Sequence, residues 1–342
     1  MARSPSTFAP PPWAFSAGSR LGPRRVTRLS LHHFRRILPD RAGVRTGLTS
    51  RSREKELCSA SEATPRCGSA ERPNADLSFP RVSTVTTNSY AWACSTNGAL
   101  SAEQRRAVKA AIRRGYREIG RGLLSWPLHR SKTDATLPGA PDSALARLAE
   151  EAAADQGPAL AGHGYRTWVI GDALALHDGL PLDRELFYVA SLLHDSGLLR
   201  EVVGQDFTIR SARLVLDLCG QVETVDDATG LRLADAIVGH ASPGLTVKDD
   251  ELAFYVQAGA MADLAGLRMW DLPRGYLAAA YAQHPACDVH RTVPALIRRE
   301  ARDVPEGRFA VLRSAGLDRM VQFSPTRRYR SKATATQPVR RP

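Results

Sequence analysis

The chain has 342 residues, a formal net charge of +12 at pH 7 and 43% hydrophobic residues, enough for one large folded domain or two small ones. No uninterrupted apolar run reaches the roughly 18 residues that a membrane span needs, and the N-terminus lacks the apolar core of a secretory signal. The five cysteines are odd in number and widely spaced, which predicts neither a disulfide framework nor a zinc finger. We therefore expect a cytoplasmic protein without membrane association.

The positive charge is concentrated at the two ends of the chain. Residues 1–100 hold 15 Lys and Arg against 6 Asp and Glu, whereas residues 161–323 hold 16 against 22 and residues 324–342 hold 6 against none. The first 100 residues are also rich in Pro, Ser and Arg, which predicts a disordered basic arm. An organellar transit segment and a mis-assigned start are the alternatives. Residues 313–342 are expected to form a basic C-terminal tail.

The first predicted helix belongs to a basic segment, residues 101–141, that also contains a linker. Ser101 and Gln104 have the spacing of a capping box. An apolar stripe follows on one face, surrounded by arginines; its members are Ala107, Val108, Ala111, Ile112 and Tyr116. The helix is expected to dock on a core. The chain ends show no recognition motif and few aromatic residues, so no specific nucleic-acid partner is expected.

From residue 142 to residue 312 the pattern is helical throughout, with starts at Asp, Ser or Thr and stops at Gly or Pro. The predicted helices span about 142–156, 160–177, 183–195, 206–220, 226–240, 249–265, 271–284 and 293–302. No alternating strand pattern is long enough for a sheet. The sequence therefore predicts an all-α fold.

One of these helices ends in an unusual way, because the apolar residues before Leu193 run directly into His194 and Asp195. Burying an imidazole and a carboxylate costs free energy unless something pairs with them, and a divalent metal ion does so. Two further segments carry similar groups inside apolar helices. His163 lies 31 residues before His194, and Asp263 lies 68 residues after Asp195.

The order His163, His194-Asp195, Asp263 resembles the H…HD…D signature of the HD-domain superfamily of metal-dependent phosphohydrolases. The resemblance covers about residues 140–312, roughly half of the chain. It implies an HD-domain helical bundle in which His163, His194, Asp195 and Asp263 hold one divalent metal ion. The ligand types suit Fe, Mn, Zn, Ni, Co or Mg.

Two shorter stretches, 206–212 and 257–260, look like the branch of this superfamily that contains cyanamide hydratase and its bacterial relatives. In binuclear members two more histidines lie between the HD pair and the last Asp. Here only His240 lies in that interval, which favours a single metal ion.

Besides Asp195, three residues are catalytic candidates. Arg166 lies one helical turn after His163 and could reach an anionic substrate, or it could form a structural salt bridge. His240 is an acid/base candidate, or a helix-end histidine. Glu201 is a general acid or base candidate.

The leading functional prediction is metal-dependent hydrolysis of a small phosphorylated metabolite or nucleotide by activated water. A phosphate pocket needs cations, for which Arg166 and Arg210 are the candidates. The first alternative is a cyanamide hydratase-like hydro-lyase that adds water to a small nitrile in a small apolar pocket. The second is a non-catalytic regulator that binds a metabolite. A homo-oligomer is left open.

Overall fold

The helices that periodicity and capping residues predict are present in the computed structural model, which describes residues 87–125 and 136–329. These residues form twelve α-helices and two short 3-10 helices, and no strand occurs among them. The prediction of an all-α fold is therefore confirmed. All described residues belong to one unit of the chain, residues 53–342. Most of the predicted arm and the end of the predicted tail lie outside the described residues.

The helices are α2 (Tyr90–Thr96), α3 (Ala102–Ser125), α4 (Ala144–Ala154), α5 (Gly157–His177), α6 (Arg184–Leu193), η3 (Ser196–Leu199), α7 (Phe207–Cys219), α8 (Asp227–Gly239), α9 (Glu251–Ala265), α10 (Tyr276–Gln283), α11 (Val289–Asp303), α12 (Arg308–Ser314), α13 (Leu317–Gln322) and η4 (Pro325–Tyr329). Seven of the α-helices begin where a polar side chain accepts a hydrogen bond from a backbone N–H of the first turn. These capping residues are Ser89, Ser101, Ser143, Asp183, Asp206, Asp226 and Asp250.

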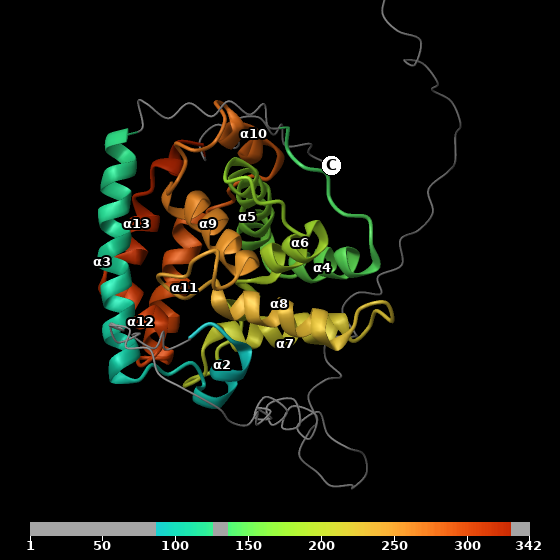
Figure 1. Cartoon of the computed structure of the whole chain (residues 1–342), viewed down its shortest axis with the longest axis horizontal. Helices are drawn as coiled ribbons and strands as arrows, with labels where there is room; N and C mark the ends of the chain where they lie inside the picture. Colours follow the sequence, from blue (N-terminus) through green and yellow to red (C-terminus); the bar gives the residue numbers. More distant parts are fainter. Residues whose placement is uncertain (1–86, 126–135, 330–342) are drawn as a thin grey trace, which may run out of the picture. The chain divides into compact units, whose positions relative to one another are not determined.

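Two helices, α5 and α9, pack along each other at the centre of the bundle (Figure 1). Both are apolar on most of their surface, which is typical of helices that are covered on all sides. Helices α4 and α6 pack against each other and against α5. Helices α7 and α8 form a second pair, which packs on α4 and α6, and α11 packs with α12 and α13. None of the described helices is long and apolar enough to cross a membrane.

The structure differs from the expected domain boundaries at both ends of the bundle. Helix α2 lies in the range expected for the arm, yet Tyr90 and Ala93 are buried and the Tyr90 N–H donates to Asp235 Oδ1 at 2.7 Å. A helix of seven residues contains fewer than two full turns, so its sequence shows no sustained helical periodicity. At the other end, α12 spans residue 312 and α13 follows it, because both pack on α11.

Helix α3 docks on the bundle through its apolar stripe. Ser101 and Gln104 form the expected capping box, with reciprocal hydrogen bonds of 3.1 and 2.8 Å. Val108 and Ala111 are buried, and the helix packs on α12. Further along, the Tyr116 hydroxyl donates to the Ala315 carbonyl at 2.6 Å. On the other side of the helix Arg113, Arg114 and Arg117 are exposed.

Candidate metal centre

Three polar side chains meet in the interior of the bundle. His163 lies in the middle of α5, His194 ends α6, and Asp195 begins η3. All three are buried. The Nε2 atoms of His163 and His194 are 3.3 Å apart, and Asp195 Oδ2 lies 3.6 and 3.5 Å from them. The apolar helix that ends in His194-Asp195 thus brings both residues to His163, as the sequence predicts.

The separations of these three atoms suit a shared metal ion. Two ligand atoms at about 2.1 Å from one ion, subtending a near-tetrahedral angle, lie about 3.4 Å apart. The observed separations of 3.3 to 3.6 Å match this spacing. The group offers two imidazole nitrogens and a carboxylate oxygen, without a thiolate. His163, His194 and Asp195 therefore form a cluster that could hold a divalent metal ion.

Hydrogen bonds on the far side of each ring turn the Nε2 atoms towards the cluster. His194 Nδ1 lies 2.8 Å from the Ser191 carbonyl oxygen, which can only accept a hydrogen bond. His163 Nδ1 lies 2.7 Å from Asp263 Oδ2. Both Nδ1 atoms therefore carry the proton, and both Nε2 lone pairs are available.

Asp263 does not occupy the position expected of a fourth ligand. Its carboxylate accepts from His163 Nδ1 and from Arg166, with Nε to Oδ1 at 2.7 Å and Nη2 to Oδ2 at 3.1 Å. It therefore lies behind the His163 ring, away from the cluster. Burial alone would raise the pKa of Asp263, but Arg166 and His163 outweigh burial and lower the pKa below its ordinary value. The ionised carboxylate positions His163.

The electrostatics of the cluster follow from its burial and from its neighbouring rings. Burial lowers the pKa of His194 to about 3, against the attraction of Asp195. Burial would raise the pKa of Asp195, but His194, His240 and His163 together lower the pKa below its usual value. The cluster thus presents a neutral imidazole and an ionised carboxylate, the protonation states that metal binding requires.

His240 ends α8 and lies next to the cluster. Its ring packs edge-to-face on His194 with 4.8 Å between centroids, and its Nε2 is 3.7 Å from Asp195 Oδ1. Its Nδ1 bonds to the Ile237 carbonyl oxygen, which leaves the Nε2 lone pair on the cluster side. His240 can therefore exchange a proton at Nε2 beside Asp195.

Three cationic or acidic candidates lie away from the cluster. Arg166 is fully buried, and besides Asp263 it donates to the backbone carbonyls of His284 and Pro285. Arg210 is also buried, paired with Glu300 at 2.9 Å. Glu201 is 64% exposed and pairs with Arg299 at 3.0 Å. The structure therefore places Arg166 behind His163, and gives Glu201 no contact with the site.

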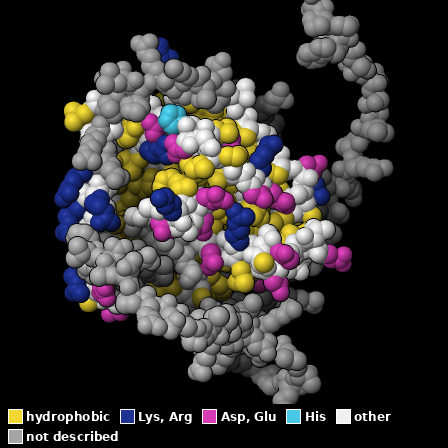
Figure 2. All heavy atoms as spheres, in the orientation of Figure 1, with side chains coloured by type: hydrophobic (Ala, Val, Ile, Leu, Met, Phe, Trp, Pro, Cys, Tyr) yellow, Lys and Arg dark blue, Asp and Glu magenta, His cyan; other side chains and the backbone are white. Residues whose placement is uncertain are grey.

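A cavity of about 220 Å³ opens against the cluster. Its wall includes His163, His194, Asp195 and His240 at one end and is otherwise almost entirely apolar. Most of the remaining wall comes from α3, α9 and α11 to α13, and the rest comes from Leu198 of η3 and from the segments that follow α8, α9 and α12. Figure 2 shows hydrophobic side chains in a hollow beside the edge that carries the Lys and Arg of α3.

Sequence reasoning missed the part of this wall that α3 provides. Ile112, Gly115, Tyr116 and Ile119 all line the cavity. The signal was present, because Gly115 and Ile119 continue the apolar stripe of α3 at helical spacing.

The sequence was also compared with known proteins. No family model matches the chain, and a search of curated proteins finds no match.

Proposed function

We propose that this chain is a metal-dependent enzyme that activates water for addition to, or hydrolysis of, a small uncharged molecule, and that it has the HD-type helical bundle that its sequence resembles. One observation carries the proposal. His163 Nε2, His194 Nε2 and Asp195 Oδ2 are buried within 3.3 to 3.6 Å of one another on the wall of an apolar cavity. Burying two imidazoles and a carboxylate together costs free energy unless a partner compensates them, and a divalent metal ion is such a partner.

In this proposal each residue has a separate task. His163, His194 and Asp195 hold one divalent ion, which when bound supplies Lewis-acid activation of water. Asp263 and Arg166 keep His163 in the tautomer that presents Nε2. His240, with its Nε2 3.7 Å from Asp195 Oδ1, takes up or returns a proton at the reacting group. The apolar walls exclude competing water from the rest of the cavity.

The lining of the cavity favours an uncharged substrate over a phosphate ester. Among the described residues that line it there is no Lys or Arg. Arg166 and Arg210, the cations considered for phosphate, are engaged by Asp263 and Glu300. The hydratase-like alternative of the sequence analysis therefore gains support relative to phosphate-ester hydrolysis.

The first test is the metal content of the full-length chain, measured by mass spectrometry after reconstitution with Mn, Fe, Ni or Zn. We expect about one ion per chain, lost in His194→Ala and in Asp195→Asn. His177, an exposed residue at the end of α5, provides the control: His177→Ala keeps the ion. Circular dichroism verifies that each variant is folded. The proposal is contradicted if the wild-type chain binds no metal after reconstitution, or if His194→Ala still binds about one ion per chain.

The second test compares reactions on the metal-loaded chain. Hydration of cyanamide and of benzonitrile is followed beside hydrolysis of phenyl phosphate. We expect turnover of an uncharged nitrile and none of the phosphate ester. Turnover of phenyl phosphate alone would favour the phosphohydrolase, and a metal-loaded chain that turns over none of these compounds would favour the non-catalytic regulator.

A further inference from the structure

We infer that the cavity beside the His163, His194 and Asp195 cluster binds an uncharged, hydrophobic molecule about the size of a bicyclic aromatic, with a hydrogen-bond donor directed at Gln257. As a statement about substrate, this inference rests on the proposed function. As a statement about binding it does not, because the walls that carry it are separate from the metal ligands.

The walls of the cavity are apolar, which favours an uncharged, hydrophobic ligand. Aliphatic and aromatic side chains converge from five α-helices, α3, α9, α11, α12 and α13; they include Ile112, Met261, Leu264, Ile297, Phe309 and Leu312. Removing apolar surface from water on such walls stabilises a bound ligand by roughly 25 cal/mol per Å². A negatively charged ligand would lose its hydration in this cavity, and no Lys or Arg is among the described residues that line it to compensate the charge.

The volume gives the size of the ligand. A protein cavity of roughly 150 Å³ lined by Leu, Ile and Phe binds benzene. The present cavity of about 220 Å³ is larger by about half, which corresponds to about nine non-hydrogen atoms by the same proportion. A nitrile as small as cyanamide would leave most of this space empty.

Gln257 provides a polar contact away from the cluster. Its Nε2 donates to the backbone carbonyls of His240 at 2.6 Å and Ser242 at 2.9 Å, which uses both N–H groups and fixes the orientation of the amide. Gln257 lines the cavity, so its Oε1 is available as an acceptor for a ligand. Tyr116, which α3 contributes to the wall, already donates its hydroxyl to the Ala315 carbonyl.

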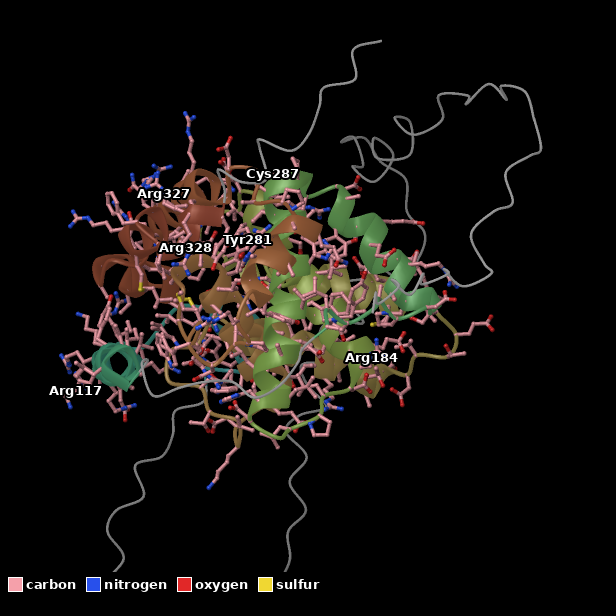
Figure 3. All side chains as sticks on the ribbon, turned by 90° about the horizontal axis from the view of Figure 1, so that it is seen from above. Arg117, Arg184, Tyr281, Cys287, Arg327 and Arg328 are labelled. Carbon is pink, nitrogen blue, oxygen red and sulfur yellow. The ribbon has the colours of Figure 1, made fainter. Side chains whose placement is uncertain are left out.

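Helix α3 covers the cavity with its apolar side, while its Arg113, Arg114 and Arg117 are exposed. Arg117 points away from the bundle in Figure 3, whereas Gly115 and Ile119 line the cavity. A Cβ atom at Gly115 would meet no atom within 4 Å, so a larger side chain there has room to enter the cavity. A Cβ atom at Gly120 would also meet no atom within 4 Å, but Gly120 does not line the cavity.

The experiment measures the affinity of indole for the full-length chain by isothermal titration calorimetry, with and without a chelator. Indole is uncharged, has the expected size and carries one N–H. We expect it to bind in both conditions and at least tenfold more tightly than phenyl phosphate. Gly115→Leu is expected to weaken indole binding at least tenfold, while Gly120→Leu changes it less than twofold. Both substitutions replace a helical glycine on α3, so their effect on helix propensity is matched.

A second pair of measurements isolates Gln257. Gln257→Met is expected to weaken indole binding about two- to tenfold, the effect of one neutral hydrogen bond. N-methylindole has no N–H, so its affinity should be the same for Gln257→Met and wild type. Equal losses for both ligands would overturn the role of Gln257.

The outcomes separate this inference from the proposed function. If metal binds but indole does not, or if phenyl phosphate binds more tightly, the inference is wrong and the function stands. If indole binds but the chain takes up no metal, the function fails and the binding inference stands. Equal indole affinities for Gly115→Leu and Gly120→Leu would place the ligand outside this cavity.

Discussion

Asp263 and Arg166 are both fully buried, and each neutralises the other directly behind His163. Their two parallel hydrogen bonds form the bidentate geometry that makes such pairs directional. Arg166 also satisfies two backbone carbonyls where α10 ends. This pair therefore links α5, α9 and the segment after α10, and it holds the imidazole of a candidate ligand.

Replacing Asp263 by Asn is expected to lower the free energy of unfolding by about 3 to 5 kcal/mol, because it leaves the buried charge of Arg166 without compensation. Urea unfolding of the metal-free chain measures the loss. Asp142→Asn removes the carboxylate of an exposed pair with Arg147 and should have no measurable effect. Equal stabilities for the two variants would show that Asp263 does not neutralise Arg166.

For individual residues, the sequence predicts well which side chains come together, but it predicts less well what each of them does. His194 and Asp195 could be assigned because a polar pair at the end of an apolar helix needs a partner. The position of Asp263 could not, since a carboxylate can face either nitrogen of the His163 ring. The nitrogen that Asp263 faces depends on the point at which α9 crosses α5, and no local sequence pattern encodes that point.

The crossing of α5 and α9 brings two backbones unusually close at the level of elements. A Cβ atom on Gly259 would lie 2.2 Å from the Thr167 carbonyl oxygen, and one on Gly171 would lie 2.7 Å from the Tyr255 carbonyl oxygen. Both glycines have helical φ, so space and not backbone freedom requires them. The close approach places Asp263 within reach of His163.

Gly259→Ala is expected to destabilise the chain by about 1 to 3 kcal/mol, because the added methyl group forces the two helices apart. The control is Gly120→Ala on α3, where a Cβ meets nothing within 4 Å. There the same substitution should stabilise the helix by up to about 1 kcal/mol. Thermal unfolding of both variants measures the difference. A stabilising effect of Gly259→Ala would contradict the close crossing.

Capping residues and hydrophobic periodicity predicted most of the elements themselves. Asp183, Asp226 and Asp250 begin α6, α8 and α9 where the sequence indicated. Helix α2 was not predicted, because its seven residues contain fewer than two full helical turns. The glycines that allow the crossing read as ordinary small residues in an apolar run, since the pattern alone contains no information on the partner helix.

Across the whole molecule, several neutral histidines are buried or half-buried around the central helices. Burial lowers the pKa of His284 and of His290 to about 4, and of His194 to about 3. His284 ends α10 and stacks on Tyr165, while His290 lies in α11 and hydrogen-bonds Thr326. These histidines come from different helices, so their protonation opposes the packing of the bundle as a whole.

The metal-free chain is therefore expected to lose stability as the pH falls from about 6.5 to about 4. In this window these histidines bind more protons in the unfolded chain than in the folded chain, because their folded pKa values lie below the ordinary value of 6.5. Glu300, whose pKa burial raises to about 7, acts in the opposite direction and offsets part of this loss. The stability that the histidines contribute is fully present above pH 6.5 and decreases towards pH 4. After allowance for solvent screening, His290 should contribute about 1 kcal/mol of this loss. Asp195 and Asp263, whose pKa values are lowered, add a further loss only at more acidic pH.

The measurement is urea unfolding at a series of pH values between 4 and 8 in the presence of a chelator. His290→Gln should flatten the dependence, since glutamine does not titrate and can still bond to Thr326. His177→Gln, at an exposed position, should leave the dependence unchanged. If His290→Gln and wild type lose the same free energy over this range, the proton uptake resides elsewhere, and the bundle tolerates a charged imidazole at α11.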